Sequence, residues 1–163
     1  MQEMVIYGVS FDLVGKQPIV LLKTADGNKF LPIWIGHPEA AAILMKLQNA
    51  STPRPMTHDL LTEILGQLSA EIVRITVTEL RENTFYAQIT VQQDGSEIEI
   101  DSRPSDAIAL AIRSEAPIFA SDRVIEESAI EFEEEVNEEE MVAEFKRFLD
   151  SVSADEFAVE DEE

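Results

Sequence analysis

IDSRPSDAIALAIR, residues 100–113, decides how the chain is built, because it joins the end of a strand to the start of a helix. The alternating pattern before Arg103 is typical of a strand, and Pro104 followed by alanine, isoleucine and leucine is typical of a helix with proline in its first turn. The junction carries five polar side chains: Asp101, Ser102, Arg103, Ser105 and Asp106. They can cap the helix, or they can hold a phosphate, a metal ion or both at its N-terminus.

Two halves of the chain show the same order of predicted elements, three strands and then a helix. In the first half, three β-rich runs are separated by turns and occupy residues 4–14, 17–24 and 25–36. A helix then begins at Pro38, where the apolar residues take up helical spacing. In the second half, three more β-rich runs precede the helix at Pro104 and occupy residues 71–80, 84–93 and 96–101.

A further helix, predicted between the two halves, carries a stripe of apolar side chains. We expect Thr57 to cap this helix. The stripe consists of Leu60, Leu61, Ile64, Leu65 and Leu68. An amphipathic helix in a globular protein usually buries its apolar face, so we expect the stripe to pack on the core. Trp34, at the end of the third predicted strand, is also expected in the core.

These elements predict an α+β fold, in which two β-meander-plus-helix halves form one mixed sheet-and-helix domain over residues 1–130. Within it, residues 116–120 read as a short buried strand, and Ser121 as the cap of a brief helix. Residues 131–163 form an acidic C-terminal extension. A capping-box pattern at Asn137 predicts one amphipathic helix there. Its apolar face consists of Met141, Val142, Phe145, Phe148, Leu149 and Val152.

The formal net charge of −21 is concentrated in the C-terminal part of the chain. From Asp122 onward there are 18 acidic and 3 basic residues. Nucleic-acid binders usually present a basic surface, and this composition does not indicate one.

The chain has no cysteine, which excludes disulfide frameworks and thiolate metal sites. No run approaches the ~20 apolar residues of a membrane span, and no signal peptide is recognisable, so we expect a cytoplasmic protein.

Because the sequence lacks the motifs of the well-marked enzyme classes, the function that remains to be considered is phosphate or metal chemistry at helix N-termini. The sequence has no P-loop, no HExxH motif and no nucleophile elbow. Unpaired backbone N–H groups and the helix dipole attract anions to a helix N-terminus. Polar side chains gather at three such junctions: His37 and Glu39 at the first, Arg54, His58 and Asp59 at the second, and the five residues of IDSRPSDA at the third.

Each of these side chains also has a purely structural explanation. Asp59 and Asp106 favour the helix dipole from first-turn positions, and serines at such junctions are commonly caps. Arg54 and Arg103 each precede a proline and can pair with a carboxylate as well as with a phosphate. His37 is expected to be a surface or capping group.

The chain resembles the bifunctional nuclease domain family, long described as a domain of unknown function, over about residues 4–130. Six motifs carry the resemblance in this order: LPIWIG, EAAAI, RPMTHDLL, NTFYAQI, IDSRPSDAIALAIR and APIF. The resemblance implies an α+β fold that tends to form oligomers, with activity against both DNA and RNA. The family's polar signature positions fall here on Arg54, Thr57, His58, Asp59, Asp101, Ser102, Arg103, Ser105 and Asp106.

The leading hypothesis is a metal-assisted nuclease with little sequence preference that acts on DNA, RNA or both. Under it, His58 moves a proton as part of a catalytic set with the carboxylates of Asp59, Asp101 and Asp106. The same carboxylates hold a divalent cation such as Mg²⁺, Mn²⁺ or Ca²⁺. Phosphate is bound by Arg54, Arg103, Ser102 and Ser105.

Partners follow from the same hypothesis: a nucleic acid bound weakly and in a salt-dependent way, and further copies of the chain, with no membrane. The alternative is a non-catalytic oligomeric module that binds a small anionic ligand or a protein partner through the same helix ends. The signature residues would then determine the fold, and the acidic extension would shield the site or engage a basic partner.

Overall fold

The structure is a computed structural model that describes residues 1–11, 15–131, 142–143 and 146–147. Its main elements, in chain order, are β1 (Gln2–Phe11), β2 (Pro18–Thr24), β3 (Lys29–Trp34), α1 (His37–Leu47), α2 (Thr57–Gln67), β4 (Ala70–Arg81), β5 (Thr84–Gln93), β6 (Ser96–Ser102), α3 (Pro104–Ser114), β7 (Ile118–Ala120), α4 (Asp122–Ser128) and β8 (Ile130–Glu131). The predicted α+β class is confirmed.

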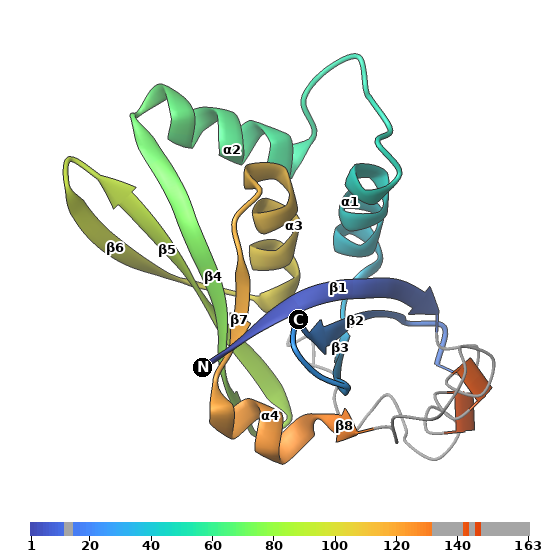
Figure 1. The fold of residues 1–163 in the computed structure, drawn as a ribbon. Coiled ribbons are helices and arrows are strands. Elements are labelled where there is room, and N and C mark those ends of the chain that lie inside the picture. The colour runs from blue at the N-terminus through green and yellow to red at the C-terminus, as the bar shows by residue number, and fades with distance from the viewer. Residues whose placement is uncertain (12–14, 132–141, 144–145, 148–163) are drawn as a thin grey trace.

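The strands form one mixed eight-stranded sheet within the described residues, in the order β6-β5-β4-β7-β1-β2-β3-β8. The two predicted meanders, β1-β2-β3 and β4-β5-β6, are its two halves, and the short strand β7 lies between them (Figure 1). β7 pairs antiparallel with β1 and parallel with β4, so it joins the halves into a single sheet.

The turns of the second meander have the backbone that their sequence requires. Asp94 and Gly95 between β5 and β6 have φ of 51° and 78°, and Glu82 and Asn83 between β4 and β5 have φ of 51° and 61°. Positive φ at both central residues gives the tight hairpin turn whose twist matches that of the flanking strands. The register of both hairpins is therefore fixed locally.

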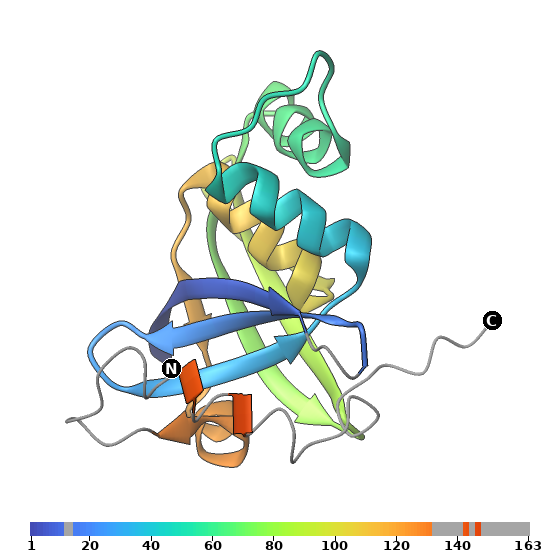
Figure 2. The ribbon, with the colours of Figure 1, turned by 90° about the vertical axis from the view of Figure 1, so that its right-hand side faces the viewer.

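Helices α1 and α3 pack against the sheet, and α3 is the more deeply buried of the two. Seven of its residues are buried, and the five from Ala107 to Ala111 belong to one core cluster with side chains of both sheet halves. Figure 2 shows α1 and α3 side by side, with α2 at the far end of the pair. Trp34 is buried at 7% exposure, as predicted.

The prediction that the apolar stripe of α2 packs on the core is wrong. Its residues Leu60, Leu61, Ile64 and Leu68 are 49%, 41%, 44% and 60% exposed. α1 and α3 already pack on the sheet, and the buried residue of α2 is His58, in its first turn. Of the stripe, Leu65 packs against the core cluster. The other leucines and the isoleucine therefore remain on the surface.

Two smaller predictions concern helix starts. Ser121 caps α4 as predicted, since its hydroxyl oxygen accepts a hydrogen bond from the backbone N–H of Val124 at 3.2 Å. Thr57 does not cap α2; it is the first helical residue, and Met56 occupies the cap position. None of the described helices is long and apolar enough to cross a membrane.

Most of the acidic extension lies outside the described residues. Of the predicted amphipathic helix, residues 142–143 and 146–147 are described and have helical backbone. The remaining residues of its apolar face, including Phe145 and Phe148, lie outside. The boundary predicted after residue 130 falls within β8, which pairs with β3.

The burial of α3 predicts that Ile108 contributes more to the stability of the fold than the exposed Ile98 does. Ile108→Ala removes a side chain that is 0% exposed, so it should lower the free energy of unfolding by about 2–5 kcal/mol through lost burial and a residual cavity. Ile98→Ala is the matched control, because Ile98 is 45% exposed on β6 and should change it by less than about 1 kcal/mol. Urea unfolding of both variants measures the difference, and equal effects would contradict this packing.

Candidate active site

All three helices of the predicted site carry an acidic residue at the third helical position. These residues are Glu39 in α1, Asp59 in α2 and Asp106 in α3. A carboxylate in the first turn is stabilised by the helix dipole, which explains each acid taken alone. In the structure, each of the three also contacts a basic side chain. Glu39 pairs with Arg103, Asp59 pairs with Arg113, and Asp106 contacts both Arg103 and His58.

Four side chains from the three helix starts form one hydrogen-bonded cluster, which we call the His58 cluster. His58 Nε2 lies 2.9 Å from Asp106 Oδ1. Arg103 donates to the other oxygen, Asp106 Oδ2, from Nε at 3.1 Å and from Nη2 at 2.9 Å. Arg103 Nη2 also donates to Glu39 Oε1 at 2.7 Å. The cluster therefore links α1, α2 and α3 through residues that are far apart in sequence.

The arrangement of the His58 cluster determines which nitrogen of His58 carries hydrogen. Asp106 accepts hydrogen bonds from the Arg103 guanidinium, so it acts as a carboxylate, which accepts and does not donate. Nε2 of His58 is therefore the protonated nitrogen, and in the neutral ring Nδ1 carries the lone pair. This is the tautomer in which His58 can take a proton through Nδ1.

Arg103 is the cation that pairs with both carboxylates of the cluster, Glu39 and Asp106. Its hydrogen bond to Glu39, followed by that to Asp106, raises the pKa of the guanidinium above its usual value, so Arg103 stays cationic. Two carboxylates face this one guanidinium. The Arg103 side chain is nevertheless 63% exposed, and its described hydrogen bonds use Nε and Nη2, which leaves Nη1 for a ligand.

Gly36 makes room for the carboxylate of Glu39. A β-carbon at position 36 would collide with Glu39 Oε2. Gly36 caps α1 with extended backbone, so no unusual φ requires a glycine there, and a larger residue would require the Glu39 carboxylate to shift. The carboxylate thus lies over the cap of its own helix, with Oε1 directed to Arg103.

Asp59 does not join the His58 cluster, because it pairs with Arg113 near the end of α3. Arg113 Nε donates to Asp59 Oδ1 at 2.7 Å, and its two terminal nitrogens donate to the carbonyls of Ala109 and Ala42. The Arg113 side chain is 7% exposed. These bonds connect all three helices a second time, at the opposite side of the first turn of α2.

Of the predicted site residues, His58, Arg103 and Asp106 are brought together. Ser102 donates to the Arg103 carbonyl and so supports the junction. Ser105 is buried in the first turn of α3, and Thr57 is exposed. Asp101 is exposed on β6, and no hydrogen bond or ion pair of its side chain occurs among the described residues.

The carboxylates predicted to hold a metal are not gathered. Among the described residues, no three or more histidine, aspartate or glutamate side chains lie close enough together to bind a metal ion. Asp59 faces Arg113, Asp106 faces His58 and Arg103, and Asp101 stands apart on β6. The use of a divalent cation stays a prediction.

Two residues that complete these contacts were not among the predicted site residues. Glu39 was recognised at the first junction, and its third helical position, shared with Asp59 and Asp106, was the available signal. Arg113 lies seven residues after Asp106, which places both on one face of α3, because seven residues are close to two helical turns. That spacing is visible in the sequence.

The residues of the His58 cluster help to line a largely apolar groove of about 670 Å³. Its apolar wall comes from α1, α2, α3 and the strands β5 and β6, and includes Met45, Met56, Leu61, Ile64, Leu65, Ile89, Val91, Ile100 and Leu110. The exposed stripe of α2 therefore forms part of this wall. A ligand with an apolar part and an anionic end would fit the groove chemically.

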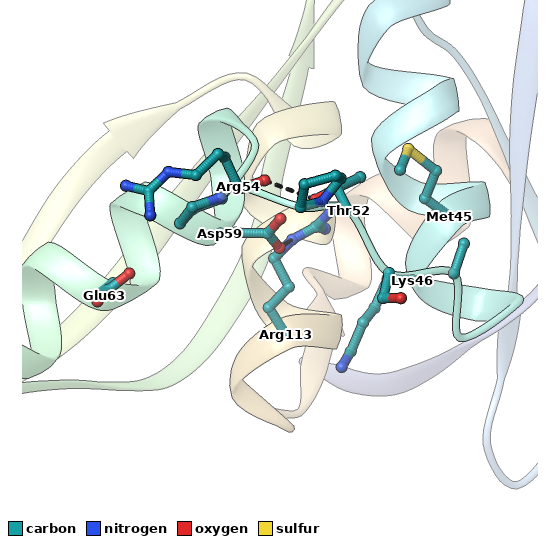
Figure 3. Close-up of a pocket in the computed structure, with 11 residues that line it drawn as sticks. Met45, Lys46, Thr52, Arg54, Asp59, Glu63 and Arg113 are labelled. Carbon is teal, nitrogen blue, oxygen red and sulfur yellow. Dashed lines mark hydrogen bonds and ion pairs between the residues drawn. The ribbon is translucent and has the colours of Figure 1, made fainter.

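A second, more polar pocket of about 370 Å³ lies on the other side of the first turn of α2. Figure 3 shows the Asp59–Arg113 pair in this pocket between Arg54 and Lys46. Glu63 of α2 also lines it. Three cationic side chains thus meet two carboxylates there, a balance opposite in sign to that of the His58 cluster.

Comparison with known proteins places this geometry in a family context. Residues 20–133 match the family model described as the bifunctional nuclease domain. An uncharacterized protein of Mycobacterium tuberculosis is 37% identical over 164 residues, which covers 96% of this chain and 98% of that protein. The match therefore extends over nearly the whole length of both proteins.

Plant proteins match over a shorter stretch. Bifunctional nuclease 1 of Oryza sativa subsp. japonica is 28% identical over 109 residues, which are 64% of this chain and 33% of that protein. Bifunctional nuclease 1 of Arabidopsis thaliana is 29% identical over 105 residues, 62% of this chain and 32% of that protein. The similarity thus covers about a third of each plant protein.

The Asp59–Arg113 pair predicts a pH dependence of stability. The hydrogen bond from Arg113, and then that from the backbone of Met56, hold the pKa of Asp59 below its usual value of 3.8. A lowered pKa in the folded state means that the ionised carboxylate stabilises the fold. This contribution is complete above about pH 4 and is lost as the pH falls through the folded-state pKa.

Asp59→Asn should therefore lower the urea midpoint at pH 7, and the difference from the parent should shrink steadily below about pH 4. Asp101→Asn is the matched control, since Asp101 is an exposed carboxylate without a described partner and should leave the midpoint unchanged at pH 7. A pH-independent effect of Asp59→Asn would show that the ion pair does not stabilise the fold.

Proposed function

The chain belongs to the bifunctional nuclease domain family, and from this premise we propose that it hydrolyses phosphodiester bonds of DNA, RNA or both at the His58 cluster. The observation that carries the proposal is the hydrogen bond between His58 Nε2 and Asp106 Oδ1 at 2.9 Å, with Arg103 bound to the same carboxylate. A histidine oriented by a carboxylate beside an exposed guanidinium has the groups that this hydrolysis requires.

His58 is the proposed base. Asp106 fixes the ring through Nε2, so Nδ1 can accept the proton of a water molecule as that water attacks phosphorus. The resulting imidazolium is stabilised by the Asp106 carboxylate, as a carboxylate stabilises histidine in other hydrolases. The same ring can then give the proton to the leaving oxygen, which returns His58 to its starting protonation state.

Arg103 is the proposed phosphate ligand. Its guanidinium offers hydrogen-bond donors in a planar fork that suits phosphate oxygens. Because Arg103 already contacts Glu39 and Asp106, its position is fixed before substrate binds. Charge that develops on the phosphate oxygens would therefore meet a cation held in place.

The apolar groove supports low sequence preference. Sequence is read through hydrogen bonds to base edges, whereas phosphate contacts carry no sequence information. Away from the His58 cluster, most of the lining side chains are aliphatic or methionine, which can pack on any base. The net charge of −21 opposes nucleic acid at long range, so we expect weak binding that depends strongly on salt.

A second candidate function, a binding module that forms oligomers, is favoured by the exposed apolar surface of α2 and β6. Leu60, Leu61, Ile64, Ile98 and Ile100 are all more than two-fifths exposed. Contiguous apolar surface of this kind usually marks an interaction site. Self-association would bury it and is compatible with hydrolysis, while a module without catalysis would use the groove for a small anionic ligand or a protein partner.

The proposal predicts the effect of removing either member of the His58–Asp106 pair. His58→Ala and Asp106→Asn should each lower the rate of cleavage of single- and double-stranded substrates by about 10²–10⁴-fold, because proton transfer is lost or the ring is no longer oriented. The assay compares highly purified proteins with Mg²⁺, Mn²⁺ or Ca²⁺ and without added metal.

Glu127→Gln is the control, because Glu127 is an exposed carboxylate on α4 that pairs with Arg123. It should cleave at the parent rate. If His58→Ala and Asp106→Asn fold and also cleave at the parent rate, the activity does not arise at this site. If the parent shows no cleavage with any substrate, the binding module is the better account.

Self-association gives a separate prediction. Ile64→Glu puts a charge on the exposed apolar surface, so it should shift the protein toward the monomer in sedimentation velocity at equal concentration. Val5→Glu is the control, because Val5 is 45% exposed on β1, compared with 44% for Ile64, and should leave the distribution unchanged. A parent protein that is already monomeric would contradict the prediction.

A further inference from the structure

We propose that the polar pocket formed by Lys46, Arg54 and Arg113 is a second phosphate subsite, which holds the nucleic-acid strand beside the bond being cleaved. The inference rests on the proposed function, because it assigns the ligand as the backbone of the same substrate. We call it the Arg54 subsite. It would let the protein bind strands longer than the His58 cluster alone could hold.

Charge is the first argument. At the His58 cluster, one guanidinium faces two carboxylates, so that cluster by itself is a poor site for a polyanion. The chain has 12 basic residues in all, and three of them line the polar pocket. Nucleic-acid affinity comes mainly from cations that neutralise phosphates. The pocket beside α2 has three cations against the two carboxylates of Asp59 and Glu63, so it has the excess of positive charge that the cluster lacks.

Geometry is the second argument, because the two sites flank the same helix start. His58 and Asp59 are consecutive, yet His58 contacts Asp106 and Asp59 contacts Arg113. Asp106 and Arg113 are seven residues apart on α3, which is about 10 Å along the helix axis. At about 3.4 Å of rise per nucleotide in a stacked strand, this separation corresponds to about three nucleotides.

Arg54 is the third argument, because neither packing nor ion pairing explains it. It lies in the loop between α1 and α2, its side chain is exposed, and no carboxylate pairs with it in the described part of the chain. Pro53 and Pro55 on either side restrict the backbone, and Thr52 Oγ1 donates to the Arg54 carbonyl at 2.7 Å. A cation on a stiffened loop is preorganised for a ligand.

Helix dipoles alone do not account for the pocket. Lys46 and Arg113 stand in the last turns of α1 and α3, where a cation is stabilised without any ligand. Arg113 is also buried, at 7% side-chain exposure, and already donates hydrogen bonds to Asp59 and to two carbonyls. Lys46 is exposed and faces the same pocket, so together with Arg54 it can reach a phosphate that Arg113 helps to attract.

The test is binding of a fluorescent single-stranded oligonucleotide of about 12 nucleotides, measured by anisotropy in the full-length protein at about 50 mM and 200 mM salt. The double variant Lys46→Ala/Arg54→Ala should bind about tenfold more weakly at the lower salt concentration. The slope of log affinity against log salt should fall in magnitude by about 0.7, since the subsite holds one phosphate and each phosphate contact on a single strand contributes about 0.7.

Arg123→Ala is the matched control, because Arg123 is a 75% exposed cation on α4 that is paired with Glu127. Its affinity and slope should equal those of the parent. A double variant with parent-like affinity and slope overturns the proposal, and so does an equal loss in Arg123→Ala, which would show a general charge effect.

A second arm separates this inference from the proposed function. A dinucleotide can occupy only one of the two sites at a time, so Lys46→Ala/Arg54→Ala should weaken its binding less than it weakens binding of the longer strand. Loss of cleavage in His58→Ala with unchanged oligonucleotide binding supports both proposals. Absence of cleavage in the parent, with binding that still depends on Lys46 and Arg54, rejects the nuclease and keeps the subsite. Equal weakening for both lengths overturns the subsite.

Discussion

The rest of the structure depends on α3, because this buried helix fixes the other two at both of its ends. Its core face joins the two sheet halves in one hydrophobic cluster. Another face of α3 carries Asp106 near the start and Arg113 near the end, and each of them binds a side chain in the first turn of α2. α1 is held at the same two places, through Glu39 and the carbonyl of Ala42. The relative positions of three helix starts are thus set by side-chain contacts to one helix.

The same contacts give structural residues a chemical role. Asp106 stands in the first turn of α3, where the helix dipole favours a carboxylate, and it also orients His58 and holds Arg103. Each interaction is of an ordinary kind in a helical layer, but their convergence at the edge of an apolar groove is not required for stability. Arg103 would be most stable with its remaining donors paired, yet its side chain is largely exposed. That exposure is what a ligand site needs and a packing site does not.

The sequence predicted the strands, the helices and the buried short strand β7 because each has a local signal: alternation, helical spacing, or turn residues such as Asp94 and Gly95. The sequence did not predict the exposure of the α2 stripe. An apolar helix face indicates that burial would be favourable, but it does not show whether the rest of the fold leaves a surface for that face to pack on. His58, Arg103 and Asp106 were recognised from their junctions. The position of Glu39 and the spacing of Arg113 from Asp106 are visible in the sequence, but the contacts that these two side chains make depend on how three helices cross, which no local pattern encodes.

The central claim is that Asp106 holds His58 with hydrogen on Nε2 and the lone pair on Nδ1. Nitrogen-15 NMR of the two histidine rings tests it directly, with His37→Gln to assign the signals. The account predicts the Nε2–H tautomer for neutral His58, and a change in its Nδ1 signal when a non-hydrolysable phosphodiester analogue is added. An Nδ1–H tautomer, or ring signals that do not respond to the analogue, would contradict it.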